Sequence, residues 1–281
     1  MELSICIPTY NRSGSLIKQI NFVLEDAISI MSDDMFEIII SDNKSDDEHH
    51  KKIIKEIEGL KQKYPTVNLY YFSNKENVGL VRNLKVLANI AKGKYIWFVG
   101  DDDEIHKGII SKILPLLNEN KGMVFINHRA VDKDNNILMD NAFIGNKHKS
   151  LYEIFKHSNT TMMFITACVY KKEFVDEVFE NEDSRLSLPF YLSFYCFEKS
   201  GATLVNDIMI DNYWGDTSWS DSSWIVFSNQ IPRDIFKIIK ESKNKKDAVF
   251  AFYPFLIKTF VSIAKHKIFK FIKFFLKKND K

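Results

Sequence analysis

Residues 95–103 read Tyr-Ile-Trp-Phe-Val-Gly-Asp-Asp-Asp, a stretch that joins an apolar run to three consecutive carboxylates. A continuous β-branched and aromatic run is typical of a strand that is buried on both faces, as in the middle of a parallel sheet. Ligands bind at the carboxyl ends of such strands. Three adjacent carboxylates repel one another and favour a nearby cation. The stretch therefore predicts an α/β fold with an acidic ligand site at Asp101, Asp102 and Asp103.

Strand-like and helix-like patterns alternate on both sides of this stretch. Strands are expected at residues 3–7, 36–40, 67–72, 123–127, 164–170 and 202–210, and helices at about 16–31, 49–64, 81–91, 189–199, 232–242 and 255–278. This alternation predicts a mixed, mostly parallel Rossmann-like sheet flanked by helices, with a C-terminal helical extension. We expect a catalytic domain at residues 1–230, made of a nucleotide-binding half (1–110) and an acceptor half (111–230), and a separate region at 231–281.

Composition indicates a globular protein with a real core. Of the 281 residues, 45% are apolar, which excludes a disordered chain. Three cysteines lie far apart without metal-ligand spacing, so buried thiols are expected. The N-terminus lacks a signal-peptide pattern. The longest late apolar run, residues 249–257, contains Pro254 and ends before Lys258, short of the ~20 residues needed to span a bilayer. These features predict a cytoplasmic protein.

Charge is distributed unevenly along the chain. Residues 237–281 hold 13 lysines and three acids, a net charge of +10, which leaves −8 for residues 1–236 of the total +2. The tail also interleaves phenylalanine and isoleucine with lysine, as amphipathic helices at membrane interfaces do. We expect residues 231–281 to bind the inner face of the membrane peripherally, with packing on the catalytic domain as the alternative. Nucleic-acid binding fits this apolar spacing less well.

Polar side chains also follow other expected strands. Asp42 ends the strand at 36–40, where a carboxylate can accept hydrogen bonds from a ribose or a base, or cap the next helix. Arg82 lies near the start of an expected helix and can bind phosphate through two nitrogens, or point to solvent. Mg²⁺ or Mn²⁺, held by one or two carboxylates and by phosphate oxygens, would offset the charge of the three aspartates; a solvated acidic turn is the alternative.

Four segments resemble, in order and spacing, the family 2 glycosyltransferases, which are inverting enzymes with the GT-A fold. They are residues 4–12 (SICIPTYNR), 37–47 (EIIISDNKSDD), 77–83 (NVGLVRN) and 95–103 (YIWFVGDDD). The resemblance implies a nucleotide-sugar donor, most often a UDP-sugar, a divalent metal, and a saccharide or lipid-linked saccharide acceptor in bacterial surface-glycan synthesis.

By this resemblance, the donor nucleotide is held by Pro8, Thr9, Tyr10, Asn11, Arg12, Asp42, Asn43, Arg82 and Asp101, and the metal by Asp102 and Asp103. The chain departs from the family pattern at two points. Gly100 stands where the D-x-D motif has its first aspartate, and Asn43 and Lys44 stand where Asp-Gly is usual. With Gly100 at that position, Asp101 has to take over the contact to the ribose or to a metal-bound water.

The family often takes its catalytic base from a Glu-Asp pair in the second half. Glu182 and Asp183 form such a pair, and we expect Asp183 to accept the acceptor hydroxyl's proton, with Asp216 as the runner-up. A helix N-terminal acid favoured by the dipole is the structural alternative for the pair. His128 and Arg129 follow an expected strand and are candidates for contact with the donor sugar, or surface residues.

Trp214, Trp219 and Trp224 lie in a polar segment and either close over the site as a lid or anchor a loop. Two other functions compete with the transferase. A sugar-1-phosphate nucleotidyltransferase would need a Gly-rich basic loop after the first strand, which residues 8–12 do not provide. A non-catalytic nucleotide-sugar or membrane-binding module stays open because of Gly100.

Overall fold

The computed structural model describes residues 1–145, 147–214 and 222–279. Contacts within the chain divide it into two compact units, Met1–Gly215 and Asp216–Lys281. The catalytic-domain boundary expected at residue 230 stays a prediction. The sheet and the candidate site belong entirely to the first unit.

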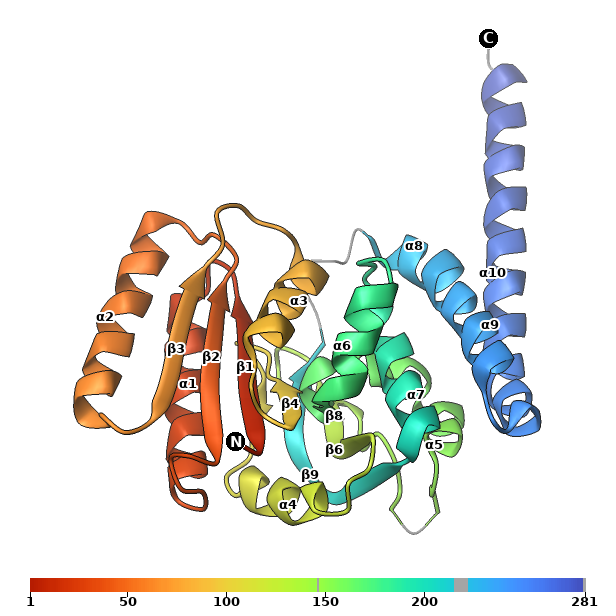
Figure 1. The fold of residues 1–281 in the computed structure, drawn as a ribbon. Coiled ribbons are helices and arrows are strands. Elements are labelled where there is room, and N and C mark those ends of the chain that lie inside the picture. Colours follow the sequence, from red (N-terminus) through yellow and green to blue (C-terminus); the bar gives the residue numbers. More distant parts are fainter. Residues whose placement is uncertain (146, 215–221, 280–281) are drawn as a thin grey trace. The chain divides into compact units, whose positions relative to one another are not determined.

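One mixed sheet forms the centre of the first unit (Figure 1). Its strands are β1 (Leu3–Thr9), β2 (Phe36–Asp42), β3 (Asn68–Ser73), β4 (Tyr95–Phe98), β5 (Glu104–Ile105), β6 (Met123–Val131), β7 (Ile137–Met139), β8 (Cys168–Lys171) and β9 (Ala202–Tyr213). They are ordered β3-β2-β1-β4-β8-β6-β9-β5, with β7 paired to β6. Every residue of β1, β2 and β4 is buried, as their continuous apolar runs predict.

The sheet is parallel in its first half and mixed in its second. β1 pairs in parallel with β2 and β4, and β2 pairs in parallel with β3. β8 is antiparallel to both β4 and β6, whereas β9 is parallel to β6 and antiparallel to β5. The expectation of a mostly parallel sheet therefore holds for β1–β4 but not beyond it. The segment read as a strand at 164–170 folds first as the short helix η2 (Ile165–Ala167) and only then as β8.

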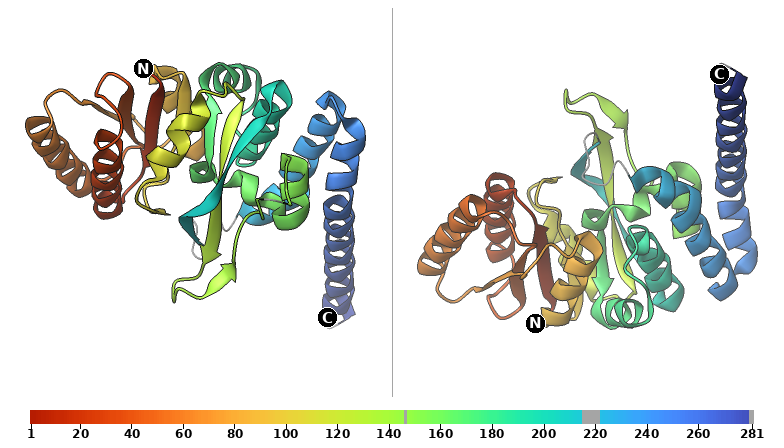
Figure 2. Two further views of the ribbon diagram at one scale, coloured as in Figure 1. Left: turned by 90° about the horizontal axis from the view of Figure 1, so that it is seen from below. Right: turned by 90° about the horizontal axis from the view of Figure 1, so that it is seen from above.

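Helices cover both faces of the sheet. They are α1 (Ser13–Ile28), α2 (Asp47–Lys63), α3 (Leu80–Ile90), α4 (Ile109–Leu117), α5 (Leu151–Ser158), α6 (Lys172–Asn181) and α7 (Leu188–Ser200), with the short helix η1 (Asn159–Met163). α1 packs with α4 on one face, and α3 packs with α6 on the other (Figure 2). In α2, Ile53, Ile57 and Leu60 recur at helical spacing and supply its buried side. The three cysteines are free and buried, as expected.

The order of the strands explains where a ligand can bind. The chain runs outward from β1 to β2 and β3, and then returns to place β4 on the other side of β1. The loops after β1 and β4 therefore leave the sheet in opposite directions. In open α/β sheets, this switch point opens the crevice that binds ligands. Residues 8–12 span the end of β1 and the loop after it, and residues 99–103 follow β4, so the fold brings both predicted segments to this switch point.

The second unit is helical. Its elements are α8 (Ser223–Ile225), the π-helical turn η4 (Val226–Gln230), α9 (Ile231–Glu241) and α10 (Lys245–Asn279). The last helix, expected from residue 255, begins earlier: α10 starts at Lys245 and runs through Pro254. By length and composition alone, Lys245–Phe269 could cross a bilayer, so the expectation of no membrane span stays a prediction. Such a single helix is weak evidence for crossing.

Candidate active site

The aspartates after β4 are bonded to the loop after β1. Thr9 Oγ1 donates to Asp101 Oδ2 at 2.6 Å. Arg12 Nη1 lies 3.1 Å from Asp101 Oδ1 and 2.5 Å from Asp102 Oδ2. One guanidinium nitrogen thus holds two neighbouring carboxylates together. Although desolvation opposes the charged form, Asp102 and Asp101 raise the pKa of Arg12. Both predicted segments meet here.

The third aspartate is turned into the protein. Thr166 Oγ1 donates to Asp103 Oδ2, and the same hydroxyl accepts from the Gly100 amide at 2.8 Å. A Cβ at Gly100 would lie 2.2 Å from Asp103 Oδ2. The carboxylate of Asp103 therefore occupies the space beside the position where the family motif carries its first aspartate. Thr166, in η2, was not predicted, because it lies 63 residues from Asp103 along the chain.

Burial and mutual repulsion make these carboxylates reluctant to ionise. Desolvation raises the pKa of Asp101 to about 6, with Asp102 adding to the rise and Thr9 and Arg12 opposing it. Desolvation likewise raises the pKa of Asp103 to about 7, opposed by the hydrogen bond from Thr166. The Asp102 side chain, in contrast, is 52% exposed. A second cation beside Arg12 would favour the ionised forms of Asp101 and Asp103.

The site fits a divalent ion that is shared with a substrate. Among the described residues, no three His, Cys, Asp or Glu side chains form a cage for a metal. Mg²⁺ and Mn²⁺ prefer oxygen ligands, and sites for them often use one or two carboxylates and complete the shell with phosphate and water. Asp102 is exposed, and Asp101 shares Arg12 with it. Both oxygens of Asp101 are bonded, to Thr9 and Arg12, and Asp103 Oδ2 accepts from Thr166. Metal binding by Asp102 and Asp103 stays a prediction.

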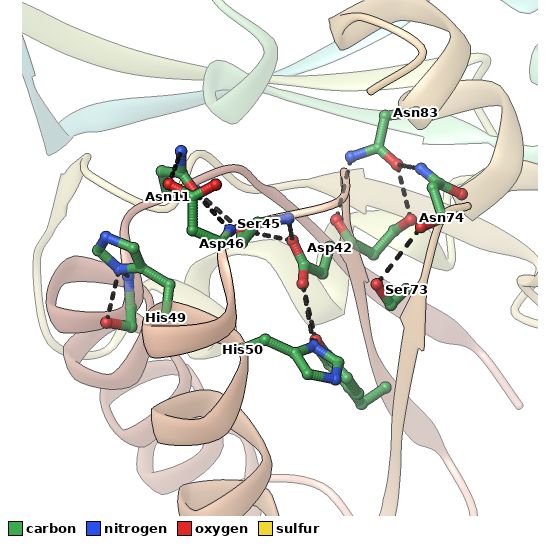
Figure 3. Close-up of polar contacts among 12 residues, drawn as sticks. Asn11, Asp42, Ser45, Asp46, His49, His50, Ser73, Asn74 and Asn83 are labelled. Carbon is green, nitrogen blue, oxygen red and sulfur yellow. Dashed lines mark hydrogen bonds and ion pairs between the residues drawn. The ribbon is translucent and has the colours of Figure 1, made fainter. Parts of the chain in front are cut away.

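Asp42 is buried, and both of its carboxylate oxygens are hydrogen-bonded within the protein. Its exposed fraction is 0%, and Oδ1 accepts from the Ser45 amide at 2.9 Å and from the Ser45 hydroxyl at 2.5 Å. Oδ2 accepts from the Tyr71 hydroxyl at 2.8 Å and lies 3.4 Å from His50 Nδ1 (Figure 3). Asp42 therefore holds the loop after β2 in shape. The expected contact with a ribose or base stays a prediction.

The loops after β1 and β2 are tied together through Ser45. The Asn11 amide donates to Ser45 Oγ at 2.8 Å, and the Asp46 amide donates to Asn11 Oδ1 at 2.8 Å (Figure 3). Asn11 and Lys44 have φ values of +55° and +67°, in the left-handed region. Asparagine adopts this region readily, but lysine does so at a cost. Lys44 thus takes the backbone conformation that suits the glycine usual at this position in the family.

Asparagines shape the turn before α3. Asn43 Nδ2 donates to Asn77 Oδ1 at 2.7 Å, and Asn43 Oδ1 accepts from the Val78 amide at 3.0 Å. Asn43 is only 5% exposed, so the structure uses it to hold this turn. Arg82 is exposed in the first turn of α3, and no described residue forms a hydrogen bond or ion pair with its side chain. Among the cations predicted for the donor, Arg82 is thus available to a phosphate.

Glu182 and Asp183 lie at the same edge of the sheet as the aspartates. Because β8 is antiparallel to β4, α6 starts at the far edge and returns toward the carboxyl end of β4. The rings of Phe179, near the end of α6, and Phe98, at the end of β4, have centroids 6.4 Å apart. Arg185 Nη1 bonds Glu182 Oε2 at 3.0 Å and Asp183 Oδ1 at 2.6 Å. The exposed fraction is 9% for the Glu182 side chain and 56% for that of Asp183, so Asp183 is the accessible member.

Other predicted residues lie elsewhere. His128 is fully buried between the rings of Phe125 and Phe164, and desolvation lowers its pKa to about 4, so the structure corrects its expected contact with a donor sugar. Arg129, on the opposite side of β6, is partly exposed. Tyr10 is 44% and Trp214 45% exposed. Asp216 and Trp219 lie outside the described residues.

Comparison with known proteins gives a consistent result. A family model described as glycosyl transferase family 2 matches residues 4–179. The chain is 25% identical over 197 residues to a GalNAc(5)-diNAcBac-PP-undecaprenol β-1,3-glucosyltransferase of Campylobacter jejuni, an alignment that covers 64% of this chain and 57% of the relative. The chain spans between 30% and 57% of the length of the first curated relatives it matches.

Solved structures share the fold. S. aureus TarS 1–349, in complex with UDP-GlcNAc, superposes with a TM-score of 0.63 at 15% identity, over 91% of this chain and 72% of that one. A mannosyltransferase of Pyrobaculum calidifontis, in complex with GDP-Man and Mn²⁺, gives a TM-score of 0.61 at 12% identity, over 94% and 75%. At these identities the likeness concerns the fold alone, which is that of the GT-A type.

Proposed function

The chain belongs to glycosyl transferase family 2, and we propose that it transfers a sugar from a nucleoside-diphosphate sugar to a hydroxyl of a saccharide or lipid-linked saccharide. The observation that carries this proposal is the junction of the β1 and β4 loops, where Thr9 and Arg12 bind Asp101 and Asp102 at the switch point of the sheet. A UDP-sugar is the donor we favour, in keeping with the UDP-GlcNAc complex of the structural neighbour TarS.

In this proposal, different residues of the chain bind different parts of the donor. The loops after β1, β2 and β3 hold the nucleoside, and Arg82 binds the diphosphate through its free guanidinium. Arg12 and Asp101 orient the diphosphate end of the donor beside Asp102. When bound, Mn²⁺ or Mg²⁺ would neutralise charge on the departing diphosphate. The Mn²⁺ in the mannosyltransferase neighbour supports this choice of metal.

Asp183 is proposed as the base of an inverting, single-displacement reaction. Its carboxylate takes the proton of the acceptor hydroxyl as that oxygen attacks the anomeric carbon of the donor. Arg185 holds Asp183 Oδ1 at 2.6 Å and so fixes its direction. Glu182, which is buried against the same guanidinium, positions Arg185. Asp183→Asn should abolish transfer and leave UDP affinity unchanged; equal loss of both would assign Asp183 to the donor site instead.

A titration of four nucleotides tests the donor site. UDP, GDP, CDP and dTDP are titrated calorimetrically into the protein with and without Mn²⁺, in the wild type and in Asp102→Asn. Asp207→Asn is the matched control, because Asp207 is also an exposed carboxylate, 59% accessible and paired to Lys112 at 2.6 Å. We expect Mn²⁺-dependent binding of one nucleotide that only Asp102→Asn removes. Absence of binding by folded protein would favour a non-catalytic membrane-binding module.

We also propose that α10 binds the inner face of the cytoplasmic membrane peripherally and so brings the enzyme to a lipid-linked acceptor. Tyr253, Phe260 and Phe269 are 60%, 49% and 65% exposed, an unusual share for large apolar side chains on one helix. Lysines on the same helix complement anionic lipid.

Flotation with vesicles of phosphatidylcholine, with and without phosphatidylglycerol, tests whether α10 binds membranes. Tyr253→Ser with Phe260→Ser should abolish binding, whereas Phe236→Ser on α9, 54% exposed, should not. Binding that resists alkaline extraction would indicate a span instead.

A further inference from the structure

A row of polar side chains lies on one face of the sheet just beyond the aspartates. Glu104 of β5 pairs with Asp211 of β9, and Arg129 of β6 pairs with the same Asp211. Directly paired residues stand on the same side of a sheet, so these three side chains form a row. Their neighbours along the strands, such as Ile105 and Ile210, are buried in the core. The polar face is therefore built into the register of three strands.

Ion pairs hold this row rigidly. Arg129 donates from Nε to Asp211 Oδ1 at 2.5 Å and from Nη2 to Oδ2 at 2.6 Å. His106 Nε2 lies 3.3 Å from Asp211 Oδ2, and its Nδ1 lies 3.0 Å from the Ile208 carbonyl oxygen. Although burial opposes ionisation, the bonds from Arg129 and His106 lower the pKa of Asp211. The Asp211 side chain is 8% exposed and that of Arg129 37%, so a buried carboxylate orients an accessible guanidinium.

An exposed aromatic ring continues the row. Tyr213 lies two residues after Asp211 in β9, on the same side of the strand. Its hydroxyl donates to Glu104 Oε2 at 2.6 Å, which raises the pKa of Tyr213. The residue is 40% exposed, so its ring is accessible while its hydroxyl is held in place. We call Glu104, His106, Arg129, Asp211 and Tyr213 the β5–β9 polar cluster.

The cluster lies on the acceptor side of the aspartates. β9 and β5 stand at the end of the strand order opposite to β2 and β3, with β4 between them (Figure 1). The loops that follow β1, β2 and β3, where we place the nucleoside, therefore leave the sheet on one side of the aspartates, and the cluster on the other. Glu104 directly follows Asp103 in the chain. A group that approaches the donor's sugar from the side away from the nucleoside would meet the cluster.

We propose that the β5–β9 polar cluster binds a neutral sugar ring of the acceptor. The inference rests on the proposed transferase function. Sugar hydroxyls need fixed donors and acceptors, which the Arg129–Asp211 pair and Glu104 provide, and a sugar ring packs on an accessible aromatic face such as that of Tyr213. A phosphate suits the cluster poorly, because Asp211 and Glu104 already offset the positive charge of Arg129. The cluster thus selects the acceptor by its hydroxyl pattern.

Saturation-transfer NMR with simple glycosides tests the proposal on the full chain. The probes are the methyl β-glycosides of glucose, galactose, N-acetylglucosamine and N-acetylgalactosamine, with UDP and Mn²⁺ present and UDP binding measured on the same samples. The variants are Tyr213→Ala and Arg129→Lys, which keeps the charge but not the two-nitrogen geometry. Tyr195→Ala is the matched control, because Tyr195 donates to Glu177 at 2.6 Å between α7 and α6 in the same kind of pair.

We expect at least one glycoside to bind and each cluster variant to weaken that binding about tenfold. Arg129→Lys loses the two-nitrogen hydrogen bonding, and Tyr213→Ala loses the aromatic face. The control should bind glycosides as the wild type does. UDP affinity should be equal in all four proteins. Three results would overturn the proposal. In the first, UDP binds but no glycoside does. In the second, the cluster variants bind glycosides as well as the control does. In the third, the variants bind UDP-GlcNAc more weakly relative to UDP while their glycoside binding is unchanged, which would assign the cluster to the donor sugar. Glycoside binding without UDP binding would support the cluster and refute the donor site.

Discussion

Replacing Gly100 by alanine should destabilise the protein by displacing Asp103. The added Cβ would lie 2.2 Å from Asp103 Oδ2 and 3.3 Å from Thr166 Oγ1, so the carboxylate has to rotate away from its hydrogen bond with Thr166. A hydrogen bond to a charged group contributes about 1.5–3 kcal/mol to the free energy of unfolding. Alanine restricts the unfolded chain and recovers roughly 0.4–1 kcal/mol. The net loss expected is therefore about 1–2 kcal/mol.

A double-mutant cycle with Asp103→Ala isolates this effect. Without the Asp103 carboxylate, Gly100→Ala meets only Thr166 Oγ1 at 3.3 Å and should be neutral or slightly stabilising. The coupling between the two positions should then be about 1–3 kcal/mol, within the range seen for residues in contact. Urea unfolding of the four proteins measures it, at about pH 8 so that Asp103, with its pKa of about 7, is ionised. If Gly100→Ala costs the same in both backgrounds, the displacement of Asp103 is not the cause.

Three further predictions concern other positions. The buried His128 has a pKa of about 4, against ~6.5 in the unfolded chain, so the unfolded state binds the proton more tightly. The free energy of unfolding should therefore fall by about 3 kcal/mol as the pH falls from 6.5 to 4. His128→Phe should remove this part of the pH dependence, as measured by urea unfolding. Lys44→Gly should raise the free energy of unfolding by roughly 0.5–1 kcal/mol at φ +67°, whereas Lys44→Ala should leave it unchanged. Asp42→Asn should lower the free energy of unfolding by about 3 kcal/mol and weaken UDP binding, because the new amide group would face hydrogen-bond donors. Arg82→Gln should weaken UDP binding and leave stability unchanged. Calorimetry of UDP binding together with thermal unfolding measures both effects.

Much of the donor half could be predicted, because its signals are local. The apolar runs of β1, β2 and β4 end at Thr9, Asp42 and Phe98, and the polar residues that follow each run therefore lie at one edge of the sheet. The role of Asp42 could not be predicted in the same way. A carboxylate at a strand end reads as a ligand contact, and only packing against Tyr71 and His50 shows that it is buried and bonded.

The second half of the sheet was harder to predict, because its arrangement depends on contacts between residues far apart in the sequence. The antiparallel insertion of β8 between β4 and β6 has no periodic signature, because β8 is short and preceded by irregular helical turns. The length of the last helix was also not predicted, because α10 continues through Pro254. Counting apolar residues stopped at that proline, whereas a helix tolerates one when its other hydrogen bonds and side chains support it.

By itself, the sequence determined the fold class, the family resemblance and the position of the aspartates along the chain, because short apolar runs, turn residues and motif order are encoded by neighbouring residues. Only the tertiary structure decided which groups meet: Thr166 with Asp103, Arg12 with Asp101 and Asp102, and Arg129 with Asp211. Members of these sets lie between 63 and 90 residues apart along the chain. Their contact depends on strand order and register, which the packing of the whole sheet determines.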